Sequence, residues 1–401
     1  MPRPRRPHPP PPAVRMSMTP FTVHVPQPAL DDLRDRLTRA RWPDAVERPA
    51  WDYGTDPDYL RELTAYWRDA FDWRAQEAAM HRFAHFRAEV SGPDLRPFGL
   101  HFLHERGRGP APLPLVLSHG WPDSFLRMAK IIPLLTDPSA HGGDAADAFD
   151  VVVPSLPGYG FSDRPSVRGC SASQIATLFA RLMTEVLGYA RFGAHGGDWG
   201  STVTEDLARD HASAVVGIHL TDVPSRHARK PPAALSPREV EYLARYRQWQ
   251  QDEGAYSMLQ GTKPQTLAYG LADSPVGLAG WIVEKFRAWS DCGGDVETRF
   301  SKDELLSNIA LYWLTDTIGS SVRIYYEEQQ HPRPDANDRV AGVPAGFALF
   351  PKDIVPPPRA WAERFFDVRR WAEMPRGGHF AALEEPALLA EEIRAFFRPL
   401  R

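Results

Sequence analysis

The chain has 401 residues, of which 43% are hydrophobic and 24% are charged, as in ordinary globular proteins. Lysine and arginine total 47 against 51 aspartate and glutamate residues, so no basic excess favours a nucleic-acid partner. Cys170 and Cys292 are too few for a disulfide framework, and without a secretory signal they favour a cytoplasmic location. The longest apolar runs are short and contain proline, so we expect no membrane span.

Two segments precede the first predicted strand. Residues 1–18 are basic and rich in proline, with no apolar core, which predicts a disordered tail. Residues 19–85 are aromatic and helix-forming, with Leu30, Leu33 and Leu37 at helical spacing. This second segment predicts a helical N-terminal domain that wraps around the rest of the protein.

Eight short runs rich in Val, Leu and Phe predict strands, because each ends near Gly, Pro or Ser. In chain order they are FRAEVSG, LHFLHER, PLVLSHG, FDVVVPS, RFGAHG, AVVGIHLTDVP, GFALF and DVRRWAEM. The run from Ser171 to Gly188 has one apolar face and predicts a helix.

The order of these elements predicts an α/β fold with a mostly parallel eight-stranded sheet and helices on both faces. A Pro-rich hinge and a mainly helical stretch, residues 224–340, separate the sixth strand from the seventh. We therefore expect a helical lid at 224–340, inserted between two core segments at 86–223 and 341–401.

The segment His195-Gly-Gly-Asp-Trp-Gly-Ser201 lies between a predicted strand and a predicted helix, where a nucleophile elbow occurs. Small residues allow a turn tight enough to present the central side chain, here Asp198. No Gly-x-Ser-x-Gly occurs in the chain, which disfavours an ordinary esterase or lipase. Because Gly-Gly-Asp is also a common turn, this motif alone does not identify a site.

Three further motifs accompany the elbow. His119-Gly-Trp-Pro122 follows the third strand, where a hydrolase loop supplies an oxyanion-hole N–H, and Pro157-Gly-Tyr-Gly-Phe-Ser162 follows the fourth. Gly377-Gly-His-Phe380 follows the last strand, the usual place of the catalytic base. The order is therefore nucleophile first and histidine last.

In this order HGWP, PGYGFS, GGDWGS and GGHFAALEEP closely resemble the epoxide hydrolase family of the α/β-hydrolase fold. The resemblance is to the microsomal and juvenile-hormone branch, which has its own N-terminal domain, and it extends from about Phe21 to the C-terminus. The chain departs from this branch by having Asp123 after HGWP, where many relatives have Gly. It also lacks the hydrophobic anchor of microsomal forms, which favours a soluble enzyme.

The resemblance implies a role for each matching residue. It makes Asp198 the nucleophile and His379 the base that activates water. The acid is implied to be Asp353 in Phe-Pro-Lys-Asp, with Asp222 after the sixth strand as a rival. The lid residues Tyr256 and Tyr325 are implied to hold the epoxide oxygen, although Tyr326 is adjacent to the second.

The oxyanion hole is implied to consist of the backbone N–H groups of Trp121 and Trp199, and Trp121 is also expected to contact substrate. The implied reaction opens an epoxide to a vicinal diol through an ester on Asp198, with no metal or organic cofactor. The expected partner is a small epoxide, bulky or aromatic because the lid contains several tryptophans: Trp249, Trp281, Trp289 and Trp313. Xenobiotic and secondary metabolism both fit, and a homodimer is left open.

Two alternatives remain open. A haloalkane dehalogenase uses the same Asp and His on the same fold but stabilises a leaving halide with donors such as Trp N–H. A non-catalytic protein that binds hydrophobic ligands could also keep this fold, although such proteins usually lose a member of the catalytic set.

Overall fold

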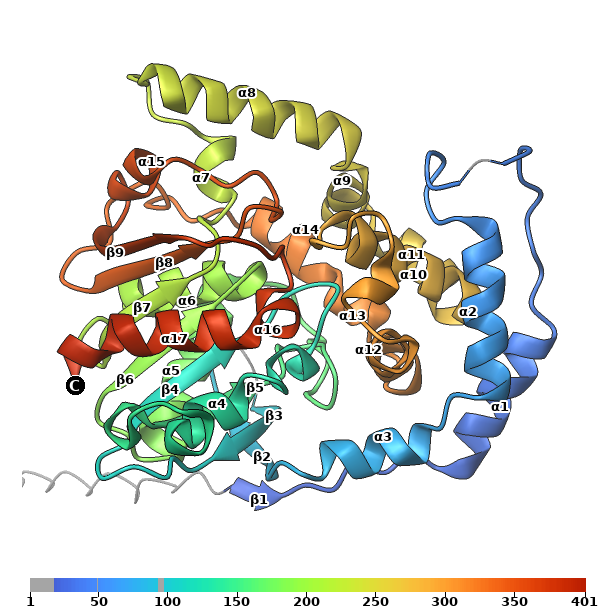
Figure 1. Ribbon diagram of the computed structural model, residues 1–401, viewed down its shortest axis with the longest axis horizontal. Helices are drawn as coiled ribbons and strands as arrows, with labels where there is room; N and C mark the ends of the chain where they lie inside the picture. Colours follow the sequence, from blue (N-terminus) through green and yellow to red (C-terminus); the bar gives the residue numbers. More distant parts are fainter. Residues whose placement is uncertain (1–17, 49, 93–96) are drawn as a thin grey trace, which may run out of the picture.

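A nine-stranded sheet forms the centre of the protein (Figure 1). The computed structural model describes residues 18–48, 50–92 and 97–401. In chain order the strands are β1 (Met18–Pro20), β2 (His85–Val90), β3 (Phe98–Glu105), β4 (Leu113–Ser118), β5 (Phe149–Pro154), β6 (Phe192–Gly196), β7 (Val215–Leu220), β8 (Pro344–Leu349) and β9 (Asp367–Glu373). Their spatial order is β1-β2-β3-β5-β4-β6-β7-β8-β9. The six strands from β5 to β9 in this order are parallel, whereas β1, β2 and β3 are antiparallel.

The eight predicted strands are all present, and the predicted strand count was one too low. The additional strand, β1, pairs with β2 so that Met18 lies opposite Ala88. Met18 was assigned to the disordered tail, and this assignment was wrong for that residue. A three-residue edge strand has no hydrophobic period to detect, because its place is fixed by backbone pairing. The rest of the predicted tail, residues 1–17, lies outside the described residues.

The helices form three groups along the chain. The N-terminal group is α1 (Gln27–Thr38), α2 (Pro57–Asp69) and α3 (Trp73–Met80). The sheet-covering group is α4 (Ile132–Thr136), α5 (Ala172–Arg181), α6 (Trp199–Asp210), α15 (Arg359–Glu363), α16 (Ala381–Glu384) and α17 (Pro386–Phe397). The third group lies between β7 and β8 as α7 (Arg226–Arg229), α8 (Pro237–Asp252), α9 (Ala255–Thr262), α10 (Pro264–Asp273), α11 (Pro275–Ala288), α12 (Lys302–Leu314), α13 (Ile318–Ser321) and α14 (Arg323–Gln330).

The predicted helix from Ser171 to Gly188 has two parts. The α-helix α5 ends at Arg181, and a π-helical turn continues it from Leu182 to Val186. Here the N–H of Leu187 donates to the carbonyl of Leu182 at 3.0 Å, one residue farther than in an α-helix. The chain then leaves at Gly188, whose φ of 76° suits glycine.

Helix α17 packs closely on the parallel strands, and glycines in the strands allow this approach. A Cβ added at Gly193 of β6 would lie 2.6 Å from the ring of Phe397. A Cβ at Gly346 of β8 would lie 2.5 Å from the ring of Phe396. The two aromatic rings therefore fill the space that side chains at these positions would occupy, and they support the strand that precedes the elbow.

The N-terminal helices connect the antiparallel edge of the sheet to the lid helices (Figure 1). Helix α2 packs against α11 and α12. The hydroxyl of Thr55 donates to the carbonyl of Gly280 at 2.6 Å, and the hydroxyl of Tyr66 donates to Asp303 at 2.9 Å. Among the described residues, none of the helices combines the length and apolarity needed to span a membrane.

Candidate active site

Asp198 lies in the sharp turn between β6 and α6. Its φ of 59° and ψ of −129° are strained for a residue with a side chain. A Cβ added at Gly196 would lie 2.1 Å from the carbonyl oxygen of Gly200, and one at Gly200 would lie 2.1 Å from that of Ser118. Both positions therefore require glycine, as the elbow motif predicts, and the turn presents Asp198 at the carboxyl end of the sheet.

The two oxygens of the Asp198 carboxylate have different neighbours. Oδ1 accepts a hydrogen bond from the backbone N–H of Trp121 at 2.8 Å. Oδ2 lies 3.4 Å from Nε2 of His379. One oxygen is thus fixed by the loop after β4, and the other faces the imidazole.

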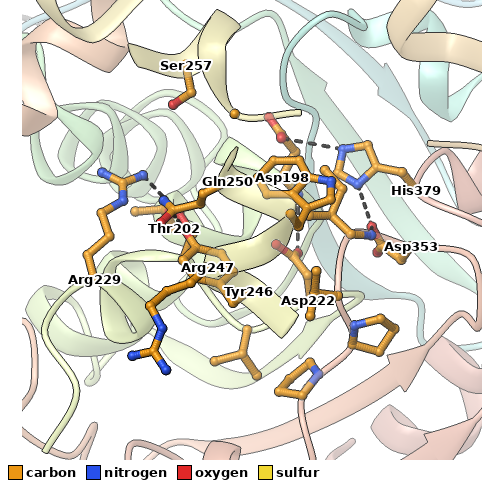
Figure 2. A pocket seen from close by; sticks show the side chains of 18 of the residues that line it. Asp198, Thr202, Asp222, Arg229, Tyr246, Arg247, Gln250, Ser257, Asp353 and His379 are labelled. Carbon is orange, nitrogen blue, oxygen red and sulfur yellow. Dashed lines mark hydrogen bonds and ion pairs between the residues drawn. The ribbon is translucent and has the colours of Figure 1, made fainter. Parts of the chain in front are cut away.

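The ring of His379 contacts Asp353 through its second nitrogen. Nδ1 of His379 lies 2.7 Å from Oδ1 of Asp353, which also accepts from the N–H of Ile354 at 2.6 Å (Figure 2). Burial alone lowers the pKa of His379, but the negative charges of Asp353 and Asp198 outweigh it and raise the pKa to about 10. The imidazole is therefore held as a cation while both carboxylates are ionised.

Asp222, the rival acid, occupies a different position behind the elbow. It accepts a hydrogen bond from the N–H of Asp198 at 3.2 Å and another from the hydroxyl of Ser201. Burial, followed by the charge of Asp353, raises the pKa of Asp222 to about 7. Asp353 accepts the hydrogen bond from the ring of His379, and Asp222 instead supports the backbone of the elbow.

Tyr256 from α9 and Tyr325 from α14 face the same cavity as Asp198. Both rings are buried, with their centroids 6.0 Å apart. Burial raises the pKa of each phenol well above its ordinary value, and the charge of Asp198 adds to this increase. Both hydroxyls therefore keep their protons, and Tyr326 is not among the residues that line the cavity.

The two predicted oxyanion donors belong to the loop after β4 and to the start of α6. The N–H of Trp121 already donates to Asp198. Trp199 is the first residue of α6, where a backbone N–H has no acceptor within the helix. The indole of Trp121 stacks on Tyr256 at 5.4 Å and does not line the cavity. Contact between the Trp121 side chain and substrate stays a prediction.

A buried ion pair that the sequence did not reveal connects the loop after β4 to His379. Asp123 accepts from the N–H of Gly120 at 2.8 Å and pairs with Arg127. Arg127 in turn donates to the carbonyl of His379 at 2.6 Å. Burial tends to raise the pKa of Asp123, but the charge of Arg127 outweighs it and holds the pKa below its ordinary value. The only sequence signal was two opposite charges four residues apart after HGWP.

Lys285 of α11 is a second side chain that sequence reasoning missed. It is buried, and its Nζ lies 4.9 Å from the centroid of the Tyr256 ring and 5.7 Å from that of Trp289. Its ammonium also pairs with Glu284 at 2.5 Å. A lysine within an apolar helical run gives no sign of which aromatic ring it will contact.

The cavity has a volume of about 600 Å³. Asp198, His379 and Asp353 lie at one side of it, and residues from α7, α8 and α9 line the other side (Figure 2). Of the four lid tryptophans expected near substrate, Trp249 lines this cavity; the other three do not. Within the described part of the chain, no three His, Cys, Asp or Glu side chains are grouped to hold a metal ion.

Two sequence families match the chain, "Epoxide hydrolase N terminus" over residues 18–128 and "alpha/beta hydrolase fold" over residues 114–278. Epoxide hydrolase 1 of Oryctolagus cuniculus is 36% identical over 413 residues, covering 95% of this chain and 88% of that protein. A Stigmatella aurantiaca protein whose name also refers to an epoxide hydrolase is 45% identical over 389 residues, covering 96% and 86% of the two chains.

Solved structures agree with these sequence matches. The crystal structure of juvenile hormone epoxide hydrolase from Bombyx mori has a TM-score of 0.83 at 27% identity, covering 96% of this chain and 95% of that one. An Aspergillus niger epoxide hydrolase has a TM-score of 0.83 at 30% identity, covering 96% and 97%. The likeness includes the N-terminal helices and the lid as well as the sheet, and the chain belongs to the epoxide hydrolase family of the α/β-hydrolase fold.

Proposed function

We propose that this protein hydrolyses an epoxide to a vicinal diol through a covalent ester on Asp198. The observation that carries the proposal is the position of the Asp198 carboxylate, between the N–H of Trp121 and the imidazole of His379, in a cavity that two protonated tyrosines also line. A carboxylate can displace a strained epoxide carbon without first losing a proton.

In the first step, Oδ2 of Asp198 attacks an epoxide carbon from the side opposite the ring oxygen. The carbon–oxygen bond breaks, and its electron pair remains on that oxygen. The phenols of Tyr256 and Tyr325 stabilise this charge by hydrogen bonding and supply a proton, as positioned general acids do. The product of the step is an ester between the substrate and Asp198.

In the second step, His379 removes a proton from water, which attacks the carbonyl carbon of the ester. The esterified Asp198 has no charge, so one cause of the high pKa of His379 is gone. The imidazolium then gives its proton to the phenolate left by the first step, and the neutral imidazole can act as a base. The N–H groups of Trp121 and Trp199 stabilise the oxyanion, at about 3 kcal/mol for each donor. When the intermediate collapses, the bond between the acyl carbon and the substrate oxygen breaks, and that oxygen takes a proton from the regenerated carboxyl group of Asp198. Asp353 keeps the imidazole in the correct tautomer, and the diol leaves.

The halide-binding alternative is less well supported. The indole nitrogens of Trp121 and Trp289 are buried and have no hydrogen-bond partner among the residues that the structure describes, and neither residue lines the cavity. The donors that face the cavity near Asp198 are phenols, which suit an oxygen that gains charge during ring opening. The aromatic lining and the volume support a bulky or aryl epoxide; the homodimer and the cytoplasmic location stay predictions.

The test is diol formation from styrene oxide by the wild type, Asp198→Ala and His379→Gln, with the exposed Asp44→Asn as a matched control. We expect the wild type and Asp44→Asn to form diol and the other two variants to form none.

In His379→Gln, intact-protein mass spectrometry should detect one substrate molecule bound to Asp198. In water enriched in the heavy oxygen isotope, a single turnover of the wild type should place the label in Asp198. A label found only in the diol would show direct attack by water.

A further inference from the structure

The side of the cavity formed by α7 and α8 carries positive charge. Arg229, the last residue of α7, and Arg247 of α8 line the same cavity as Asp198. Both arginines are exposed, and the neighbouring lining residues include Gln250 and Ser257. Figure 2 shows the side chains of Arg229 and Arg247 well separated from Asp198 and His379.

Neither arginine has a carboxylate partner within 4.0 Å among the described residues. Arg229 donates one hydrogen bond, from Nη2 to the hydroxyl of Ser225 at 3.0 Å. Arg226, three residues earlier, is buried and pairs with Glu205 and Asp206. Of the two arginines of α7, the one that lines the cavity is therefore the one without a carboxylate partner among the described residues.

The remaining charged groups of the cavity lie at the catalytic side, where the carboxylates of Asp198, Asp222 and Asp353 outnumber the single imidazolium of His379. If a substrate entered with its anionic end leading, these carboxylates would repel that end. At the outer side, the same group would meet two guanidinium groups, which bind carboxylates with paired hydrogen bonds. The charges of the cavity therefore favour one orientation for a molecule that has an anionic end.

We propose that Arg229 and Arg247 form a subsite for an anionic group, and that the substrates are epoxides in which an apolar spacer separates a carboxylate from the oxirane. This inference rests on the proposed function, because it assumes that the oxirane reacts at Asp198. The spacer would lie along the aromatic lining between the two sides, which includes Trp199, Tyr246 and Tyr256.

The experiment compares epoxidised undecenoic acid with its methyl ester, below the concentration at which either forms micelles. It measures kcat/KM for Arg229→Gln, Arg247→Gln and the double variant. The matched control is Arg245→Gln, an exposed arginine of α8 that does not line the cavity. We expect the wild type to prefer the acid and to lose part of this preference at high salt. The acid-to-ester ratio should fall about 3-fold in each single variant and about 10-fold in the double variant, since the arginines are exposed.

A ratio that is the same in the double variant, the wild type and Arg245→Gln would overturn the subsite and leave epoxide hydrolysis intact. If neither the wild type nor any variant opens these epoxides or styrene oxide, the proposed function fails. Ligand binding then decides whether the subsite exists. For this, calorimetry measures undecanoate and undecanol binding to the wild type and the double variant. The wild type should bind undecanoate more tightly than undecanol. The affinity for undecanoate should be about 10-fold lower in the double variant than in the wild type. Equal affinities in the two proteins would overturn the inference.

Discussion

His379 lies between two carboxylates, with Asp353 at its Nδ1 and Asp198 at its Nε2. Before the reaction both charges favour the imidazolium, which cannot accept a proton. Formation of the ester removes the charge of Asp198 only, so the imidazole becomes a base at the stage where water must be activated. Ester formation therefore has to precede water activation, because it consumes the carboxylate of Asp198 and leaves that of Asp353 charged.

The two buried acids should respond differently to the same substitution. Asp353→Asn should lower kcat roughly 10³-fold, because the amide no longer stabilises the imidazolium or fixes its tautomer. Asp222→Asn should lower kcat less than about 10-fold, because an amide oxygen can still accept from the N–H of Asp198. Steady-state kinetics with styrene oxide measures both effects, and equal losses would mean that Asp222 shares the role of Asp353.

Removal of one phenol hydroxyl from the cavity should slow ring opening. Tyr256→Phe and Tyr325→Phe should each lower kcat/KM about 10- to 100-fold, since the second phenol remains as a donor. Tyr326→Phe is the matched control, because this tyrosine is adjacent in sequence but does not line the cavity. Single-turnover kinetics should show that ester formation is the slowed step; a slower ester hydrolysis would contradict the assigned role.

At the residue scale, the sequence located the groups that follow strands and missed those that depend on packing. Asp198 and His379 could be found because tight turns need glycine, and glycine is visible in the sequence. Asp353 was preferred over Asp222 only through the family resemblance. Besides Asp123, Arg127 has the backbone carbonyl of His379 as a partner. Every residue has such a carbonyl, so this contact leaves no signal in the sequence.

At the scale of elements, the elbow depends on the close approach of α6 to β4. Gly200 lies in the first turn of α6, and an added Cβ would meet the carbonyl oxygen of Ser118. A substitution there must push the helix away from the strand. This movement would also displace the N–H of Trp199, which is the preceding residue.

Gly200→Ala should therefore lower the free energy of unfolding by about 3 kcal/mol, since overpacking against backbone cannot relax easily. Gly270→Ala is the matched control: Gly270 is exposed within α10, with nothing within 4 Å of the added carbon. That variant should gain about 0.5 to 1 kcal/mol from helix propensity. Urea unfolding measures both changes, and a Gly200→Ala protein as stable as the wild type would contradict the close approach.

The elements that the sequence predicted well are those with a strong hydrophobic period or a buried run. All eight predicted strands are of this kind, whereas β1 contains three residues and is exposed. The π-helical turn after α5 changes the hydrogen-bond pattern without changing which residues are apolar. Nor could the sequence show which face of a lid helix meets the cavity: Trp249 lines it, whereas Trp281, Trp289 and Trp313 do not.

For the whole molecule, His379 makes stability depend on pH. Its pKa is about 10 in the folded protein against an ordinary value of 6.5, so the folded state binds the proton more tightly. The resulting stability is fully present below pH 6.5 and is lost as the pH rises through 10. Buried histidines act in the opposite direction at acid pH: burial lowers the pKa of His195 to about 3, so stability is lost as the pH falls below 6.5.

Between pH 7 and pH 9, the free energy of unfolding should fall by about 2 kcal/mol more in the wild type than in His379→Gln. Urea unfolding at the two pH values measures this difference. The acid side supplies an internal control, because both proteins keep His195 and should lose stability in parallel below pH 6. If the free energy of unfolding also changed equally in the two proteins between pH 7 and pH 9, His379 would have the same pKa in the folded and unfolded chains.

The contact between α2 and α11 also has a consequence for the order of folding during synthesis. Thr55 and Gly280 are 225 residues apart, so the N-terminal segment leaves the ribosome long before its partner is made. At about 5 to 20 residues per second, the delay is on the order of 10 to 45 s. During this time the apolar faces of α1 and α2 have no lid to cover them. These faces therefore stay uncovered until α11 is made, and β8 and β9, which complete the sheet, are synthesised later still.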